Sequence, residues 1–309
     1  MNKLILTTVI LFFNISILFS QTDVVGKKYI YEFRDGTTII GTFIKEEASN
    51  IYINDMDGKE TYLPRVMVAQ IHEVNDDNIK DGEYWFKNLH DSRYFFSPTA
   101  FSLEEGEGYY SHSYWWLWQV QYGISDKFSI GGGTSIIGYP ATLNAKMSFE
   151  INTNLNYSLG WFWVGDLFGH TGNALGNRSL LNMPYGVITK GTKENNITLG
   201  AAYNTASPSS GAAAPISSER LVLNAGGTFR FGRRFSVVFE AWIFNERNDG
   251  STEITLMGGP GIRYFRKINR VTAKNGAGSK TFDFQLMHFP GMGDSGPLFI
   301  PMFGASQKF

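Results

Sequence analysis

Hydrophobic and polar residues alternate along two long runs within residues 219–246, and one tight turn separates the two runs. One face of the first run is apolar or small and the other is mainly polar: Leu221, Leu223, Ala225, Gly227, Phe229 and Phe231 against Asn224, Gly226, Thr228 and Arg230. The return run, after Gly232-Arg233-Arg234, repeats the division: Phe235, Val237, Phe239, Ala241 and Ile243 against Ser236 and Glu240. A period of two is typical of β-strands with two unlike faces, so the pattern predicts an antiparallel hairpin.

Each arm of this hairpin has roughly a dozen residues, which is about twice the usual length of a strand and enough for a tilted strand to cross a bilayer. Similar runs follow one another from residue 91 to the end of the chain, with no helical periodicity between them. Together with the hairpin they give about twelve predicted strands: 93–101, 109–122, 128–138, 143–152, 155–165, 181–190, 196–205, 254–265, 281–289 and 298–309.

The connections between these runs differ in length according to the side on which they fall. The near-side connections are short, at 125–126, 153–154, 193–194 and 232–233, except for the long segment 267–280. The far-side connections are 104–108, 139–141, 166–180, 206–218, 247–251 and 290–297, and several of these are long. Short turns on one rim and long loops on the other are typical of a transmembrane β-barrel. We therefore predict an all-β protein whose residues 91–309 form an antiparallel transmembrane barrel.

The N-terminal part of the chain has a different organisation. Residues 1–20 contain a short apolar run after Lys3, which predicts a secretory signal peptide. Residues 24–74 hold about five short alternating runs with turns at Asp35-Gly36 and Asp57-Gly58, a strong hairpin signal. Residues 75–90 are polar and acidic and are predicted to be a linker.

Two resemblances add to this interpretation. The stretch Arg34-Asp35-Gly36-Thr37-Thr38-Ile39-Ile40-Gly41 resembles the first hairpin of SH3-like and Sm-like small barrels, which implies that fold for residues 24–74. The chain also ends on Phe309 after a strand-like run, and residues 91–309 resemble bacterial outer-membrane β-barrel proteins. This second resemblance implies contact with outer-membrane lipid, recognition of Phe309 by the barrel-insertion machinery, and a periplasmic N-terminal domain.

Composition restricts the chemistry. The 309 residues include no cysteine, so thiolate metal sites and cysteine nucleophiles are excluded. The net charge of -1 gives no reason to expect nucleic acid as a partner. We expect no catalytic, cofactor-binding or metal-binding residues.

Charged residues on the predicted inward face are the candidate lumen lining, because the lipid face of a barrel resists charge. They are Lys146, Glu150, Arg230, Glu240 and Arg263. Such charges either line a narrow pore or close the lumen with ion pairs. Tryptophans near strand ends are candidate membrane-interface residues: Trp115, Trp116, Trp118, Trp161 and Trp163.

Three functions are compatible with these patterns. The first is a narrow pore or small-solute binding and transport barrel with a periplasmic adaptor domain. The second is a closed structural barrel that presents the N-terminal module to a periplasmic protein partner. The third, lipid hydrolysis through Ser111-His112-Ser113, is disfavoured because adjacent residues of a strand point to opposite faces.

Overall fold

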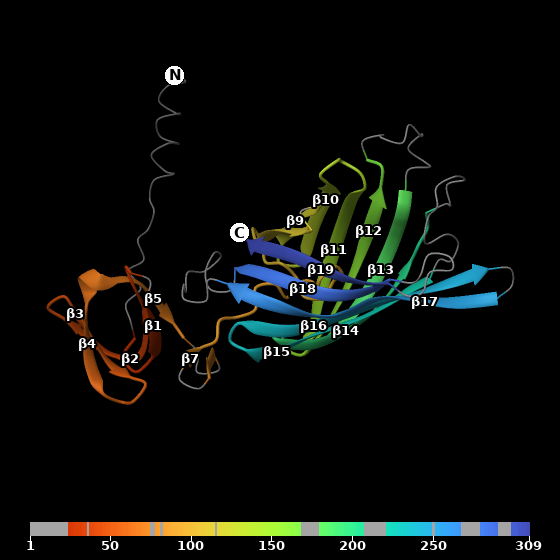
Figure 1. Cartoon of the computed structure of the whole chain (residues 1–309). Helices are drawn as coiled ribbons and strands as arrows, with labels where there is room; N and C mark the ends of the chain where they lie inside the picture. The colour runs from red at the N-terminus through yellow and green to blue at the C-terminus, as the bar shows by residue number, and fades with distance from the viewer. Residues whose placement is uncertain are drawn as a thin grey trace, which may run out of the picture. The chain divides into compact units, whose positions relative to one another are not determined.

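The structure is a computed structural model that describes residues 24–35, 37–74, 78–80, 83–114, 116–167, 179–206, 221–248, 251–266, 279–289 and 298–309. The chain divides into two compact units, Met1–Gly82 and Glu83–Phe309, and both are drawn in Figure 1. The predicted signal peptide lies outside the described residues.

The first unit contains a five-stranded antiparallel sheet with the order β4-β3-β2-β1-β5. Its elements are β1 (Lys28–Phe33), β2 (Thr38–Glu47), β3 (Asn50–Asp55), β4 (Glu60–Pro64), the 3-10 turn η1 (Arg65–Met67) and β5 (Val68–Glu73), and the short β6 (Ile79–Lys80) follows. The prediction of five short strands is confirmed.

An apolar core holds this sheet together. Its buried members are Tyr29, Tyr31, Phe43, Ile51, Ile53, Leu63 and Val68. The turn between β3 and β4 is stabilised by Asp55, whose Oδ1 accepts hydrogen bonds from the backbone N–H groups of Asp57 (3.0 Å) and Lys59 (2.9 Å). Gly58 in this turn has a φ of 78°, a conformation that favours glycine. The Asp-Gly pair therefore marks a hairpin turn, as the sequence predicts.

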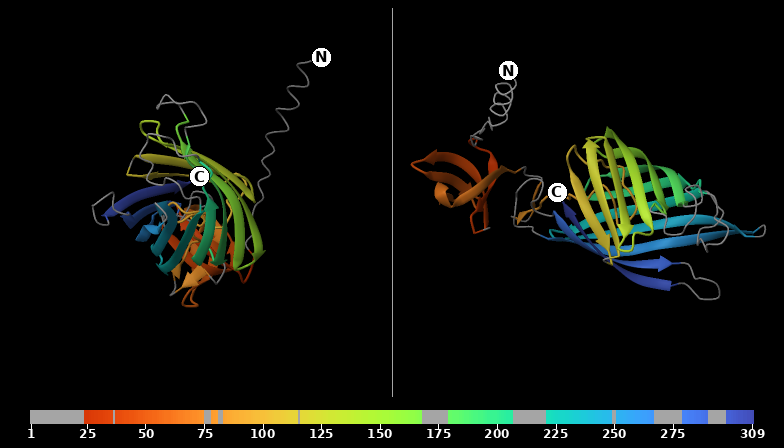
Figure 2. Two further views of the ribbon diagram at one scale, coloured as in Figure 1. Left: turned by 90° about the vertical axis from the view of Figure 1, so that its right-hand side faces the viewer. Right: turned by 90° about the horizontal axis from the view of Figure 1, so that it is seen from above.

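In the second unit, twelve described strands form one closed antiparallel barrel, visible from two directions in Figure 2. After β7 (Glu83–Tyr84) they are β8 (Gly108–Ser113), β9 (Leu117–Ser125), β10 (Phe128–Ser135), β11 (Ala141–Asn152), β12 (Leu155–Gly165), β13 (Ser179–Gly191), β14 (Asn195–Tyr203), β15 (Leu221–Gly232), β16 (Phe235–Asn248), β17 (Ser251–Arg266), β18 (Lys280–Phe289) and β19 (Leu298–Lys308). The predicted fold class is confirmed, including the central hairpin, which is β15 and β16.

Strand alternation in the barrel is the reverse of that in a soluble sheet. The outward residues of β18 are apolar and exposed: Phe282, Phe284 and Leu286. Its inward residues Thr281, Asp283 and Gln285 are buried and polar. An apolar surface of this kind on most of the strands marks a surface that water does not cover.

No helix among the described residues is long and apolar enough to span a membrane.

The two rims of the barrel differ. We call the rim where β8 begins and β19 ends the proximal rim, and the opposite one the distal rim. The strand bounds place the short connections 126–127, 153–154, 192–194 and 233–234 at the proximal rim, together with 267–279. The strand ends that flank 136–140, 166–178, 204–220 and 290–297 lie at the distal rim, and so do those that flank the short connections 114–116 and 249–250. The predicted division between a short-turn rim and a long-connection rim therefore matches most connections, and 267–279, 114–116 and 249–250 are the exceptions.

The predicted strand 109–122 is wrong, because the chain reverses within it. β8 ends at Ser113 and β9 begins at Leu117. Tyr114 has a φ of 52°, and the N–H of Trp116 donates to the carbonyl of Ser113 at 2.9 Å, which closes the turn. One predicted run thus supplies two strands.

The predicted strand 93–101 is also wrong, since these residues lie inside the barrel and not in its wall. They belong to what we call the internal loop, residues 85–107. Its tip is a tight hairpin: Arg93 and Pro98 form an isolated bridge, and the N–H of Tyr94 donates to the carbonyl of Ser97 at 2.9 Å. The total of twelve wall strands is reached because this loss offsets the extra strand at 109–122.

Residues 104–108 lie at the proximal rim and not on the far side, where the sequence placed them. The N–H of Glu105 donates to Oδ1 of Asp126 (2.9 Å), and the N–H of Gly106 donates to the carbonyl of Gly123 (3.0 Å). Because 93–101 is not a wall strand, the chain does not cross to the distal rim before β8.

Candidate functional site: the barrel lumen and its internal loop

Lys146 on β11 points into the lumen and binds the backbone of the internal loop. Its Nζ donates to the carbonyls of Ser92 (3.0 Å), Thr99 (3.1 Å) and Phe101 (2.7 Å). Its three donors are therefore all used, and the side chain is buried. These bonds hold the two limbs of the loop together, because Ser92 lies before the tip and Thr99 and Phe101 lie after it.

Arg263 on β17 does the same from the opposite wall. Its guanidinium forms a two-point ion pair with Asp283 on β18, with Nε to Oδ1 at 2.9 Å and Nη2 to Oδ2 at 3.0 Å. The remaining donors reach the carbonyls of His90 (2.9 Å) and Tyr94 (2.5 Å). A buried guanidinium whose three nitrogens all donate hydrogen bonds is held in one position.

Glu240 on β16 supplies the acceptor at the tip of the loop. Its Oε2 accepts the N–H groups of Phe96 (3.0 Å) and Ser97 (2.9 Å). The neighbouring Tyr94 hydroxyl donates to Oδ1 of Asn196 at 2.6 Å. Wall side chains thus take the place of a neighbouring strand for the loop backbone, whose polar groups must find partners once buried.

A second group of contacts lies at the proximal rim. Arg230 on β15 donates from Nη1 to the carbonyl of Phe86 (2.6 Å) and to Oε2 of Glu194 (2.8 Å). Its guanidinium carbon lies 4.4 Å from the centre of the Phe86 ring and 5.0 Å from that of Phe265. Stacking of a guanidinium on aromatic rings adds to the hydrogen bonds.

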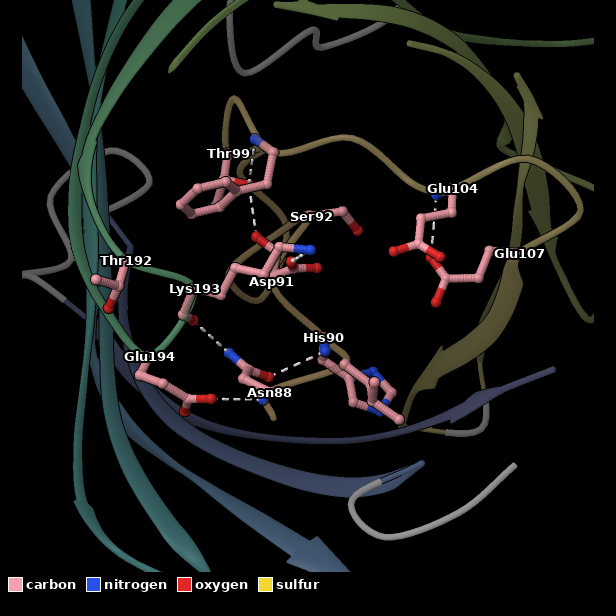
Figure 3. Close-up of polar contacts among 12 residues, drawn as sticks. Asn88, His90, Asp91, Ser92, Thr99, Glu104, Glu107, Thr192, Lys193 and Glu194 are labelled. Carbon is pink, nitrogen blue, oxygen red and sulfur yellow. Dashed lines mark hydrogen bonds and ion pairs between the residues drawn. The ribbon is translucent and has the colours of Figure 1, made fainter. Parts of the chain in front are cut away.

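Figure 3 shows how the first limb of the internal loop is bound to the turn between β13 and β14. The N–H of Asn88 donates to Oε1 of Glu194 (2.6 Å), and its Nδ2 donates to the carbonyl of Lys193 (2.9 Å). His90 lies beside them, with its N–H bonded to Oδ1 of Asn88 at 2.9 Å. The predicted linker therefore includes residues that pack within the barrel unit.

The buried carboxylate of Asp91 pairs with Lys193 at 2.9 Å. The charge of Asp91 raises the pKa of Lys193, which stays protonated at neutral pH. Lys308, near the end of the last strand, binds the carbonyl of Leu89 (2.9 Å) and Oε1 of Glu107 (3.1 Å). Each limb of the loop is therefore tied to the wall by ionic contacts.

The five candidate lumen residues thus fall into two groups. Lys146, Arg230, Glu240 and Arg263 are buried and hold the internal loop. Glu150 shares the inward face of β11 but is exposed near the proximal end of that strand. The sequence did not reveal what the four buried charges bind, because the loop had been placed in the wall.

Two inward glycines show that the wall is shaped around the loop. A Cβ added to Gly226 would lie 2.5 Å from the ring of Tyr94, and one added to Gly261 would lie 2.7 Å from the ring of Phe95. Only glycine leaves room for these rings. In the sequence, glycine at these two inward positions was a signal that another part of the chain approaches the wall closely.

Beside the internal loop, the lumen holds a cavity of about 140 Å³, lined in part by Arg93, Phe96 and Pro98 of the loop. On one side it is lined by an apolar cluster on β12 to β16 that includes Met183, Tyr185, Val222 and Trp242. The prediction from the sequence recognised only charges on the inward face, so it missed this apolar part of the lumen.

Four of the five candidate interface tryptophans lie at the distal rim. Trp116 and Trp118 are exposed around the start of β9. Trp161 and Trp163, near the end of β12, donate from Nε1 to Oδ1 of Asn182 (2.6 Å) and Oγ of Ser179 (2.7 Å). Trp115 lies outside the described residues.

The C-terminal residue takes part in closing the wall. β19 pairs with β8, and Phe309 exchanges backbone hydrogen bonds with Gly108 at 2.8 and 3.0 Å. Its ring lies against Gly108, where an added Cβ would be 2.6 Å from two ring carbons. The first and last wall strands are therefore joined at the proximal rim.

Lipid hydrolysis around His112 and metal binding are the remaining kinds of chemistry to compare with the structure. The ring of His112 packs against that of Trp118, with 5.0 Å between ring centres. Within the described ranges, no group of three or more His, Asp or Glu side chains is arranged to hold a metal ion.

A closed wall of long strands, a polar and filled interior, and an apolar outer surface define a transmembrane β-barrel of the outer-membrane type. No protein-family model and no curated protein matches the sequence.

Solved structures with a similar fold include the porin NanC, with a TM-score of 0.44 and 12% identity over 66% of this chain and 99% of that one. A loop-deletion mutant of OmpT, an outer membrane protein of Vibrio cholerae, has a TM-score of 0.33 and 13% identity over 92% of this chain and 96% of that one. OprD of Pseudomonas aeruginosa has a TM-score of 0.34 and 8% identity over 92% of this chain and 93% of that one. At these identities the similarity concerns the fold alone.

Proposed function

We propose that this protein is an outer-membrane barrel that binds and passes small solutes, and that its internal loop closes the lumen towards the proximal rim. The observation that carries the proposal is the set of wall charges, Lys146, Glu240 and Arg263, that bind the loop backbone beside a cavity. A wall that needed only rigidity could be filled by its own side chains, as small barrels are.

The orientation follows from the rims. Short turns of outer-membrane barrels face the periplasm, so the proximal rim is the periplasmic one. The chain enters the barrel unit at this rim, which supports a periplasmic N-terminal module in the role of an adaptor. The distal tryptophans Trp116, Trp118, Trp161 and Trp163 then lie at the outer membrane interface, where indole rings are favoured.

The alternative is a closed structural barrel that presents the module to a periplasmic protein. The complete use of the Lys146 donors favours it, since three hydrogen bonds hold the loop at that one side chain. The two functions differ in whether loosening the loop lets ions through.

Conductance in planar bilayers distinguishes them. We expect the wild-type protein to be nearly silent and the double variant Lys146→Met, Glu240→Leu to conduct, because the loop backbone loses its partners on both sides. The matched control is Lys127→Met, Glu150→Leu, which changes two exposed charges. If the loop variant does not conduct, only the anchoring function remains. Conductance of the wild-type protein would contradict closure of the lumen by the loop.

A further inference from the structure

The cavity beside the internal loop has two unlike walls. Its apolar wall consists of Phe162, Met183, Tyr185, Val222 and Trp242. Its polar wall carries neutral amides on β9 and β11, where Nε2 of Gln121 donates to Oδ1 of Asn144 at 2.6 Å. An apolar cavity of comparable size holds a single aromatic ring. Size and lining therefore suit a ring-sized apolar group with a polar end.

Asn224 on β15 points into this cavity and has an unused donor. The side chain is only 7% exposed, and its Nδ2 has no hydrogen-bond partner among the described atoms. A Cβ added to Gly200 would lie 2.0 Å from Oδ1 of Asn224, so glycine there makes room for the amide. A buried donor without an acceptor is costly, and an acceptor oxygen of a ligand removes that cost.

The two cationic side chains that line the cavity, Lys146 and Arg93, do not favour an anionic ligand. All three donors of Lys146 are bound to loop carbonyls. Arg93 uses its terminal nitrogens on the carbonyls of Tyr94 and Phe95 and on Ser306, and only its buried Nε has no partner. Both terminal nitrogens of Arg93 are thus engaged, which leaves no two-pronged fork for a carboxylate.

We propose that the cavity is a binding site for small uncharged molecules with a ring-sized apolar body and one acceptor oxygen, which Asn224 recognises. This inference deepens the proposed function, because it names the class of solute that the lumen holds. The apolar wall takes the body of the solute, and the Asn224 amide selects the oxygen.

Calorimetric titration of the full chain in detergent tests the site with three probes: acetophenone, ethylbenzene, which has a similar shape without the oxygen, and benzoate. We expect saturable binding of acetophenone at least tenfold tighter than that of ethylbenzene. Asn224→Leu should weaken acetophenone about tenfold, the effect of one neutral hydrogen bond, and leave ethylbenzene unchanged. Leu223→Ala, the adjacent outward residue, is the matched control.

A cavity-filling variant, Ala202→Phe, measures uptake by the detergent alone, because Ala202 lines the cavity. Equal binding to wild type and Ala202→Phe would overturn the site. Equal affinities for acetophenone and ethylbenzene would overturn the role of Asn224, and tighter binding of benzoate would overturn the uncharged class. Titration needs no ion flow, so saturable binding by the wild-type protein, together with no conductance of the Lys146→Met, Glu240→Leu variant, would overturn conduction and keep the site.

Discussion

Charged side chains of the barrel wall serve the backbone of the internal loop. Lys146 and Arg263 donate to its carbonyls and Glu240 accepts from its N–H groups, so each charge replaces a backbone partner that a strand would supply. Charge-assisted hydrogen bonds are stronger than neutral ones. A few such residues therefore fix a loop that has little regular structure of its own.

His90 adds a pH dependence at the residue scale. Its Nε2 donates to the carbonyl of Ser279 at 3.1 Å, while the buried Nδ1 has no partner among the described atoms. Burial, reinforced by the charges of Arg263, Lys308 and Arg93, lowers the pKa of His90 well below 6.5. Protonation would add an N–H with no acceptor.

The sign of the effect follows from proton binding. Below pH 6.5 the unfolded chain takes up a proton at His90 that the folded chain refuses, so stability present above this pH is lost as the pH falls. We expect the unfolding free energy to drop by about 1 kcal/mol more between pH 6.5 and 5.5 in wild type than in His90→Gln. Urea unfolding at the two pH values measures the difference, and equal slopes would contradict a buried neutral imidazole.

At the scale of elements, the sequence predicted the wall well and the interior poorly. Residues 196–199 of β14 and 281–286 of β18 alternate between polar and apolar side chains, and one lipid-facing side is enough to define such strands. Residues 93–101 contain the aromatic run Tyr94-Phe95-Phe96, which the sequence assigns to a wall strand. An apolar run does not say which part of the protein covers it, so it did not distinguish an internal hairpin from a wall strand.

The fit between loop and wall gives a prediction for one glycine. Gly226→Val would place a branched side chain where the Tyr94 ring now lies. Overpacking of this kind costs about 1–3 kcal/mol, so the loop should open more often by roughly 5- to 150-fold. Trypsin cleavage after Arg93 in the detergent-folded protein measures the opening.

The control for this variant is Gly232→Val, because a Cβ added to Gly232 meets no atom within 4 Å. Gel migration before and after heating checks that the barrel is folded in both variants. Cleavage of Gly226→Val at the wild-type rate would show that the loop does not depend on contact with β15.

At the scale of the whole molecule, each unit has its own core. The core of the small sheet contains residues from 29 to 68 alone, and the barrel clusters contain none of them. Ile51→Ala should therefore destabilise the small sheet by about 2–5 kcal/mol, since Ile51 is fully buried. The barrel should keep its stability.

Hydrogen exchange on the full chain tests this independence. Amides of β2 and β3 should exchange faster in Ile51→Ala, while those of β15 and β16 keep the wild-type rate. Tyr62→Ala is a suitable control, because Tyr62 belongs to the same sheet but is 63% exposed. Faster exchange in both units would show that they unfold together.

The internal loop enters and leaves the barrel through one mouth. Its first limb is tied at Arg230 and the proximal turn, and its second limb runs into β8 at that same rim. The chain is therefore not threaded from end to end. No pair of wall strands has to separate for the loop to leave, because only its contacts with wall side chains break. A pull on the two limbs at the proximal rim would withdraw the loop, and the same limbs would direct its return.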